Sequence, residues 1–125
     1  MTDTRSLVAV VDDSESVREA LPDLLESSGY DIHTFESAEG FLGSQSLLAV
    51  SCLILDVGLP GMSGPELQLE LIRRGQIIPI VFITAQGDAS LRPRLLARGA
   101  VACLFKPFSD TALLDAIKAA LKTRS

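Results

Sequence analysis

Five polar residues with complementary chemistry lie at the ends of the short apolar segments of this sequence. Each stands at the end of such a segment or directly after it: Asp12, Asp13, Asp56, Thr84 and Lys106. Three carboxylates in one small pocket repel one another and require a cation. A set of oxygen ligands favours a hard ion such as Mg²⁺, which binds few carboxylates and keeps several waters. If the chain brings these residues together, they predict a magnesium site.

The same five residues could carry a phosphoryl group. A carboxylate beside a metal can attack phosphorus and form an acyl phosphate, and this is the role expected of Asp56. The transferring group is an anion that needs positive charge and hydrogen-bond donors around its oxygens, which Lys106 and Thr84 would supply. An Asp-Asp pair before a helix is often only a cap, and lone polar residues at strand ends are usually solvated. The hypothesis therefore depends on all five residues meeting at one edge.

A parallel sheet would create such an edge. Five short apolar segments are typical of strands buried on both faces: 7–11, 31–35, 51–55, 80–84 and 102–105. Helical patterns alternate with them: 14–28, a segment from 37 onward, 64–75, 91–98 and 109–122. Right-handed crossovers predict an α/β fold, a doubly wound five-stranded parallel sheet in the flavodoxin-like order 2-1-3-4-5 with helices on both faces. Ligands bind beyond the carboxyl ends of such strands.

Two prolines conflict with the helical patterns. Pro22 lies in the middle of 14–28, where the loss of a backbone hydrogen bond is expected to kink or shorten the helix. Pro93 is compatible with a helix over 91–98 only if it falls in the first turn. Both positions therefore test the helix assignments.

The composition predicts one packed domain. The chain has 125 residues, of which 47% are hydrophobic and 22% charged, and its net charge is −5. We expect a single domain over residues 1–125, with its core at about 7–122. Nucleic-acid binding by this segment is disfavoured, because clustered Lys and Arg are needed to hold phosphate backbones. Without an apolar run of about 20 residues or a signal-peptide core, the chain is expected to be cytoplasmic, with no membrane contact.

Three residues with reactive side chains are interpreted as structural. Cys52 and Cys103 lie in apolar segments and lack the paired spacing of a zinc site, which favours small buried hydrophobic roles. His33 is the only histidine, and no neighbour in the sequence would orient it for catalysis. A structural or surface role is therefore expected for it.

Four segments of the chain resemble the receiver domain family of bacterial response regulators: VAVVDDSESVREAL, LILDVGLPGMSGPEL, VFITAQGD and GAVACLFKPF. The resemblance covers about Leu7 to Leu121, and it is specific because the four segments occur in this order and spacing. It implies that Asp56 is the phosphoacceptor. It also implies that Asp12 and Asp13 bind Mg²⁺, directly or through water.

The resemblance assigns roles to three further positions. The backbone carbonyl of Gly58 would complete the metal shell, the hydroxyl of Thr84 would move toward the phosphoryl group, and Lys106 would pair with that group. A cis peptide bond is implied between Lys106 and Pro107. The implied donors are a phosphohistidine on a sensor histidine kinase or phosphotransfer protein, and small phosphodonors such as acetyl phosphate. The segments ITAQGD and FKPFSD look closest to the branch that regulates a C-terminal helix-turn-helix.

The sequence departs from the family pattern at Cys103 and Gly58, and also at Pro22 and Pro93, which lie in helices where the family seldom has proline. The family usually has Tyr or Phe three residues before the lysine, as a rotating switch aromatic, where this sequence has Cys103. Cysteine has no ring to rotate, which leaves open how Thr84 is coupled to the output surface. Phe105 is expected on the same side of its strand as Cys103 and is not assigned the switch role. Gly58 has no side chain where the family often has a larger one, which predicts a phosphoryl group more open to water.

The favoured function is a phosphoacceptor signalling domain that is not a turnover enzyme. Phosphorylation would shift the surface formed by 91–98, 102–105 and 109–122, where a partner or a second copy of the chain would bind. A phosphatase of the haloacid dehalogenase type is an alternative, but it needs a second Asp where this chain has Gly58. A receiver-like module that works without phosphorylation is disfavoured by the acidic set and kept open by Cys103. A dinucleotide-binding Rossmann domain is disfavoured because no G-x-G-x-x-G follows the first strand.

Overall fold

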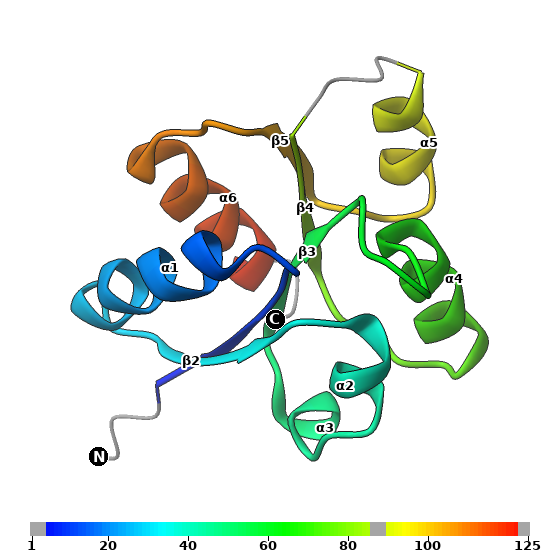
Figure 1. The fold of residues 1–125 in the computed structure, drawn as a ribbon, viewed down its shortest axis with the longest axis horizontal. Coiled ribbons are helices and arrows are strands. Elements are labelled where there is room, and N and C mark those ends of the chain that lie inside the picture. Colours follow the sequence, from blue (N-terminus) through cyan, green and yellow to red (C-terminus); the bar gives the residue numbers. More distant parts are fainter. Residues whose placement is uncertain (1–4, 86–89, 123–125) are drawn as a thin grey trace.

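One parallel sheet forms the centre of the molecule. The structure is a computed structural model that describes residues 5–85 and 90–122. In these ranges the sheet has the strand order β2-β1-β3-β4-β5 (Figure 1). Its strands are β1 (Leu7–Val11), β2 (Asp31–Phe35), β3 (Cys52–Asp56), β4 (Ile80–Thr84) and β5 (Ala102–Phe105). The predicted fold class and strand order are therefore confirmed.

Helices cover both faces of this sheet (Figure 1). In the described ranges they are α1 (Glu15–Ser27), α2 (Ala38–Leu42), α3 (Ser46–Ala49), α4 (Gly64–Arg73), α5 (Leu91–Ala97) and α6 (Asp110–Lys122). The helices α1 and α6 pack on one face, and α2 to α5 lie on the other. Among the described residues, no helix is long and apolar enough to span a bilayer.

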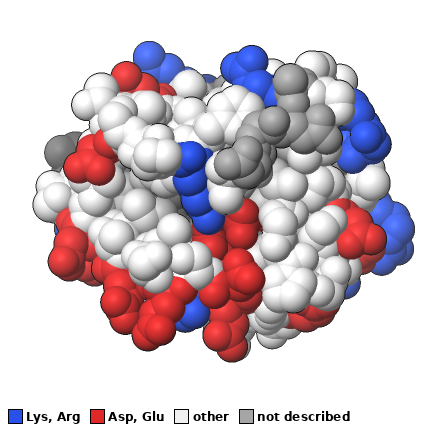
Figure 2. Space-filling model, turned by 45° about the horizontal axis from the view of Figure 1, so that its top comes forward, with Lys and Arg blue, Asp and Glu red and all other residues white. Residues whose placement is uncertain are grey.

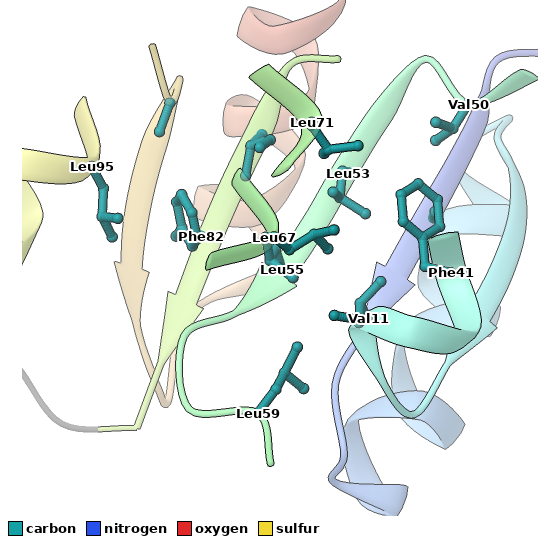
Figure 3. Packing of buried hydrophobic residues seen from close by; sticks show 14 of the residues in the cluster. Val11, Phe41, Val50, Leu53, Leu55, Leu59, Leu67, Leu71, Phe82 and Leu95 are labelled. Atoms are coloured by element: carbon teal, nitrogen blue, oxygen red, sulfur yellow. The ribbon is translucent and has the colours of Figure 1, made fainter. Parts of the chain in front are cut away.

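Two apolar layers hold the helices to the sheet. Successive residues of the central strand β3 enter different layers, Leu53 and Leu55 on the α4 side and Ile54 on the α6 side. Figure 3 shows the α4 side, where side chains of the sheet meet those of the covering helices. The consecutive apolar residues of the strands follow from burial on both faces. Cys52 and Cys103 are both buried and free, which agrees with their interpretation as core residues.

Three local features test the helix assignments. Of the two outcomes expected at Pro22, a kink or a shorter helix, the shorter helix is wrong, because α1 continues through this residue to Ser27. Pro93 is the third residue of α5 and so lies in the first turn, where its missing N–H removes no helical hydrogen bond. The four-residue helix α3 was not predicted. It is tied to the sheet by His33, whose Nδ1 lies 2.7 Å from the hydroxyl of Ser46.

Candidate functional site

Three carboxylates meet at the carboxyl edge of the sheet. The strands β1 and β3 are parallel neighbours with Val11 opposite Leu55, so the residues that follow, Asp12 and Asp56, come out side by side. Ligand oxygens of Asp12, Asp13 and Asp56 all lie within 4.8 Å of one another. Asp12 is fully buried and Asp56 is only 7% exposed, whereas Asp13 is exposed. The pocket is therefore acidic, largely desolvated and open to solvent on one side.

Lys106 brings the opposite charge into this pocket from the far edge of the sheet. Its Nζ lies 2.9 Å from Oδ2 of Asp12 and 3.9 Å from Oδ1 of Asp56. The residue follows β5, its backbone N–H donates to the carbonyl of Thr84 at 2.7 Å, and the peptide bond to Pro107 is cis, as expected. One ammonium group is thus shared unequally between two carboxylates.

The pKa of Asp56 reflects this competition. Burial raises the pKa above its usual value, and the neighbouring charge of Asp12 raises it further. Lys106 and the backbone N–H of Gly58, which lies 3.3 Å from Oδ1 of Asp56, act in the opposite direction. The balance stays on the side of a raised pKa, so the ionised carboxylate is poorly compensated by the protein alone.

The donor set fits a hard divalent cation. Oδ1 of Asp12 accepts a hydrogen bond from the backbone N–H of Ser14 at 2.7 Å. Oδ2 of the same carboxylate is buried and receives no hydrogen bond from the described residues, although the ammonium of Lys106 is close. At 2.9 Å that ammonium compensates this oxygen, whereas Oδ1 of Asp56 lies 3.9 Å from the same group. Oxygen ligands from Asp12, Asp13 and Asp56, with a solvent opening beside them, match what Mg²⁺ requires.

Thr84 ends the neighbouring strand at the same edge. In the sheet register Asp56 lies opposite Ile83, one residue before Thr84, and Thr84 lies opposite Phe105. Ile83 packs toward α6, so alternation along β4 directs Thr84 to the side covered by α5. The structure therefore joins the side chains of three aspartates and Lys106 in one cluster and places Thr84 at the adjacent strand end.

A buried thiol fills the position at which the family that the sequence resembles usually has an aromatic ring. Cys103 is 7% exposed and belongs to the apolar layer under α5, and burial raises its pKa. Phe105 is 41% exposed, and strand alternation directs it to the same side of β5 as Cys103. The residue next to Thr84 in the register is therefore an exposed ring, and Cys103 is packed below it.

Sequence reasoning missed the contacts that shape the loop after Asp56. Ser63 and Glu66 form a capping box that starts α4, a pattern readable from the sequence as Ser-x-x-Glu. Glu39 in α2 accepts a hydrogen bond from the backbone N–H of Met62 at 3.0 Å. An acid in the first turn of a helix usually only complements the helix dipole, so the sequence carried no signal for this contact.

Charge is distributed unevenly over the face of the molecule seen in Figure 2. Figure 2 shows acidic side chains gathered over the lower part of the face in view and basic side chains mainly along its upper and right margins. On this face the acidic side chains are therefore gathered rather than mixed evenly with the basic ones. A concentrated negative field attracts cations, which suits the pocket at the carboxyl edge.

Comparisons with known proteins agree with this geometry. The family model of the response regulator receiver domain matches residues 8–118. The response regulator protein TmoT of Ectopseudomonas mendocina is 43% identical over 122 residues, covering 98% of this chain and 56% of TmoT. The transcriptional regulatory protein FixJ of Azorhizobium caulinodans is 41% identical over 114 residues, covering 91% of this chain and 54% of FixJ.

A solved structure shows the same likeness in three dimensions. The response regulator StyR superposes with a TM-score of 0.89 at 47% identity, covering 96% of this chain and 61% of the StyR chain. The chain thus spans little more than half the length of the curated relatives described here.

Proposed function

This chain belongs to the receiver domain family of response regulators, and from that membership we propose that Asp56 is its phosphoacceptor. The observation that supports this most is the acidic cluster itself. Three carboxylates have ligand oxygens within 4.8 Å of one another, and Lys106 lies 2.9 Å from one of them. The raised pKa of Asp56 adds to the case, because perturbed carboxylates are frequent at functional sites.

In the proposed reaction a carboxylate oxygen of Asp56 attacks phosphorus and forms a new P–O bond. The P–N bond to a donor histidine, or the P–O bond to acetate in acetyl phosphate, breaks, and the leaving group keeps the electron pair. Asp12, Asp13, Asp56 and the backbone carbonyl of Gly58 would hold Mg²⁺. When bound, the ion would neutralise charge on the phosphoryl oxygens.

Lys106 and Thr84 would complete the site. The ammonium now lies closer to Asp12 than to Asp56, and it would turn to the phosphoryl oxygens once these are attached to Asp56. The hydroxyl of Thr84 would donate a hydrogen bond to the same group. The new group brings a charge of roughly −1.5 to −2, which is enough to bias a two-state element at this edge of the sheet.

The readout of this charge is proposed to be the surface of α5, β5 and α6. A sensor histidine kinase or phosphotransfer protein would supply the phosphoryl group in the cytoplasm, and an output partner or a second copy of the chain would bind the shifted surface. Because Gly58 stands where a haloacid dehalogenase phosphatase needs a second acid, the chain is proposed to hold its phosphoryl group without turning over an external ester.

A phosphorylation-independent interaction module is the second candidate, and Cys103 is the observation that favours it. A packed thiol cannot report the state of Thr84 in the way a rotating ring would. Under this alternative the α5–β5–α6 surface would bind its partner whether or not Asp56 is modified.

Labelling with a small phosphodonor tests the proposal. Purified chain is incubated with radiolabelled acetyl phosphate and Mg²⁺, and acid-stable, hydroxylamine-labile label is measured. We expect label on the wild type and on Asp115→Asn, an exposed control, and none on Asp56→Asn. Label that persists on Asp56→Asn would remove Asp56 from its role.

Beryllofluoride separates the two candidates, because it mimics an acyl phosphate on a carboxylate. Amide chemical shifts are recorded with Mg²⁺ alone and again after beryllofluoride is added. Changes that reach α5, β5 and α6 support the phosphoacceptor proposal, and a silent spectrum supports the interaction module.

A further inference from the structure

A carboxylate outside the acidic cluster lies against the loop that follows Asp56. Oε2 of Glu39, in α2, accepts a hydrogen bond from the backbone N–H of Met62 at 3.0 Å. The preceding residue, Gly61, has a φ of +70°, and a Cβ at this position would lie 2.8 Å from the same oxygen. Only a residue without a side chain leaves room for the contact, so the loop backbone and the carboxylate fit each other closely.

The same loop is attached to the candidate metal site at its other end. The backbone N–H of Gly58 lies 3.3 Å from Oδ1 of Asp56, and the N–H of Gly64 donates to the carbonyl of Val57 at 3.1 Å. The capping box of Ser63 and Glu66 fixes the point at which the loop enters α4. Residues 57–63 are thus held at both ends by their own neighbours and in the turn by a helix from elsewhere in the chain.

The contact is charge-assisted under ordinary conditions. The hydrogen bond from Met62 lowers the pKa of Glu39, so the carboxylate is ionised at neutral pH. Hydrogen bonds in which one partner is ionised are stronger than neutral ones. The side chain reaches across 23 positions of sequence, which makes it a tertiary attachment rather than a local cap.

We infer that Glu39 is a positioning residue for the magnesium site. It holds the 57–63 loop in place before the ion arrives, so that the carbonyl of Gly58 does not have to be ordered at the cost of binding energy. Glu39 is not among the clustered acids and acts through the loop. The metal part of this inference rests on the proposed function, whereas the loop part does not.

Three variants separate positioning from charge. Glu39→Ala removes the acceptor and the charge, and Glu39→Gln removes the charge but keeps an amide oxygen that can accept the same hydrogen bond. Glu36→Gln is the matched control, because it removes the same charge three residues away. Glu36 is exposed, and within the part of the chain that the structure describes its ion pair is a long one, 3.8 Å from Arg18. Circular dichroism confirms that each variant is folded.

Amide hydrogen exchange without metal is the first measurement. We expect the fastest exchange at Met62 and across 57–63 in Glu39→Ala, a smaller increase in Glu39→Gln, whose neutral hydrogen bond is weaker, and near-wild-type exchange in Glu36→Gln. Calorimetric titration with Mg²⁺ is the second. Affinity should fall roughly twofold to tenfold in Glu39→Ala, the range expected for one hydrogen bond, and far less in Glu39→Gln.

The outcomes are distinct. Unchanged exchange in Glu39→Ala would overturn the positioning role. Equal loss of Mg²⁺ affinity in the Gln and Ala variants, with the loop still protected in the former, would also overturn it, because the effect would then be electrostatic. A wild-type chain that binds no Mg²⁺ would sink the proposed metal site and leave the exchange result to decide the loop contact alone.

Discussion

Asp56 is a carboxylate whose ionised form the fold does little to stabilise. Its pKa is raised by burial and by Asp12, and the ammonium of Lys106 lies closer to Asp12 than to Asp56. A raised pKa means that the folded state binds this proton more tightly than the unfolded state does. By linkage, ionising Asp56 must therefore lower the free energy of unfolding.

We expect Asp56→Asn to be more stable than the wild type in the presence of a chelator at neutral pH. The wild type carries the ionisation penalty in full above the raised pKa. The penalty fades as pH falls toward the unfolded value of about 3.9 and is absent below it. Thermal denaturation with EDTA at a series of pH values measures the difference, with Asp115→Asn as the exposed control. A gap that stayed constant from neutral to acid pH would show that the penalty does not come from titration.

Gly58 offers a residue-scale test of the phosphoryl lifetime. A Cβ at this position would meet nothing within 4 Å, and the residue does not need a left-handed backbone, so a side chain can be added without strain. We expect Gly58→Arg to slow hydrolysis of the acyl phosphate by up to about tenfold, or about 1.4 kcal/mol in the barrier, by covering the phosphorus from water. Decay of label after removal of the donor measures this. Equal lifetimes for the wild type, Gly58→Ala and Gly58→Arg would rule out the steric explanation.

The clustered site residues could be predicted from the sequence because strand ends of a parallel sheet share an edge. Asp12, Asp56 and Lys106 each follow a run of apolar residues, and topology then brings them together. Glu39 could not be found this way. Its contact depends on how the turn at Gly61 and Met62 is folded, and that is set by tertiary packing rather than by a local pattern.

At the scale of elements, the strands could be predicted from the sequence, whereas the shortest helix could not. Burial on both faces gives β1, β3 and β4 continuous apolar sequences whose limits match the structure within a residue. The helix α3 has four residues, too few for a periodic pattern. The helix is linked to β2 by the contact between Ser46 and His33. This contact gives the only histidine in the sequence a structural role, as expected.

Pro22 supplies a prediction about the helix α1. The helix continues through this proline, although Pro22 cannot donate to the carbonyl four residues earlier. We expect Pro22→Ala to raise the free energy of unfolding by about 1–3 kcal/mol. Alanine is much the better helix former, and this gain exceeds the smaller loss that comes from a more flexible unfolded chain. Urea denaturation measures the change. Pro93→Ala, in the first turn of α5, is the matched control and should change stability by less than about 1 kcal/mol. A larger gain at Pro93 than at Pro22 would contradict this account.

At the scale of the whole molecule, charge and topology act at the same edge. The chain is acidic overall, and on the face seen in Figure 2 its acids gather over the lower part. Three carboxylates gathered within 4.8 Å repel one another, and the ammonium of Lys106 offsets only part of this repulsion, because the pKa of Asp56 remains raised. The fold and the proposed Mg²⁺ site should therefore be coupled energetically, since an ion that binds only the folded chain stabilises it.

We expect Mg²⁺ to raise the melting temperature of the wild type and EDTA to reverse the gain. In 100-fold excess over the dissociation constant the free energy of unfolding should rise by about 2.7 kcal/mol. Asp13→Asn should lose most of this response, because it removes one of the proposed Mg²⁺ ligands. Asp13 is exposed, so the substitution should have little effect on packing. Differential scanning calorimetry at constant ionic strength, with KCl in place of MgCl₂, separates specific binding from screening. The coupling would be refuted by a melting temperature that rises equally with both salts, or equally in the wild type and Asp13→Asn. Such a result would mean that the acidic edge is eased by general screening and not by one bound ion.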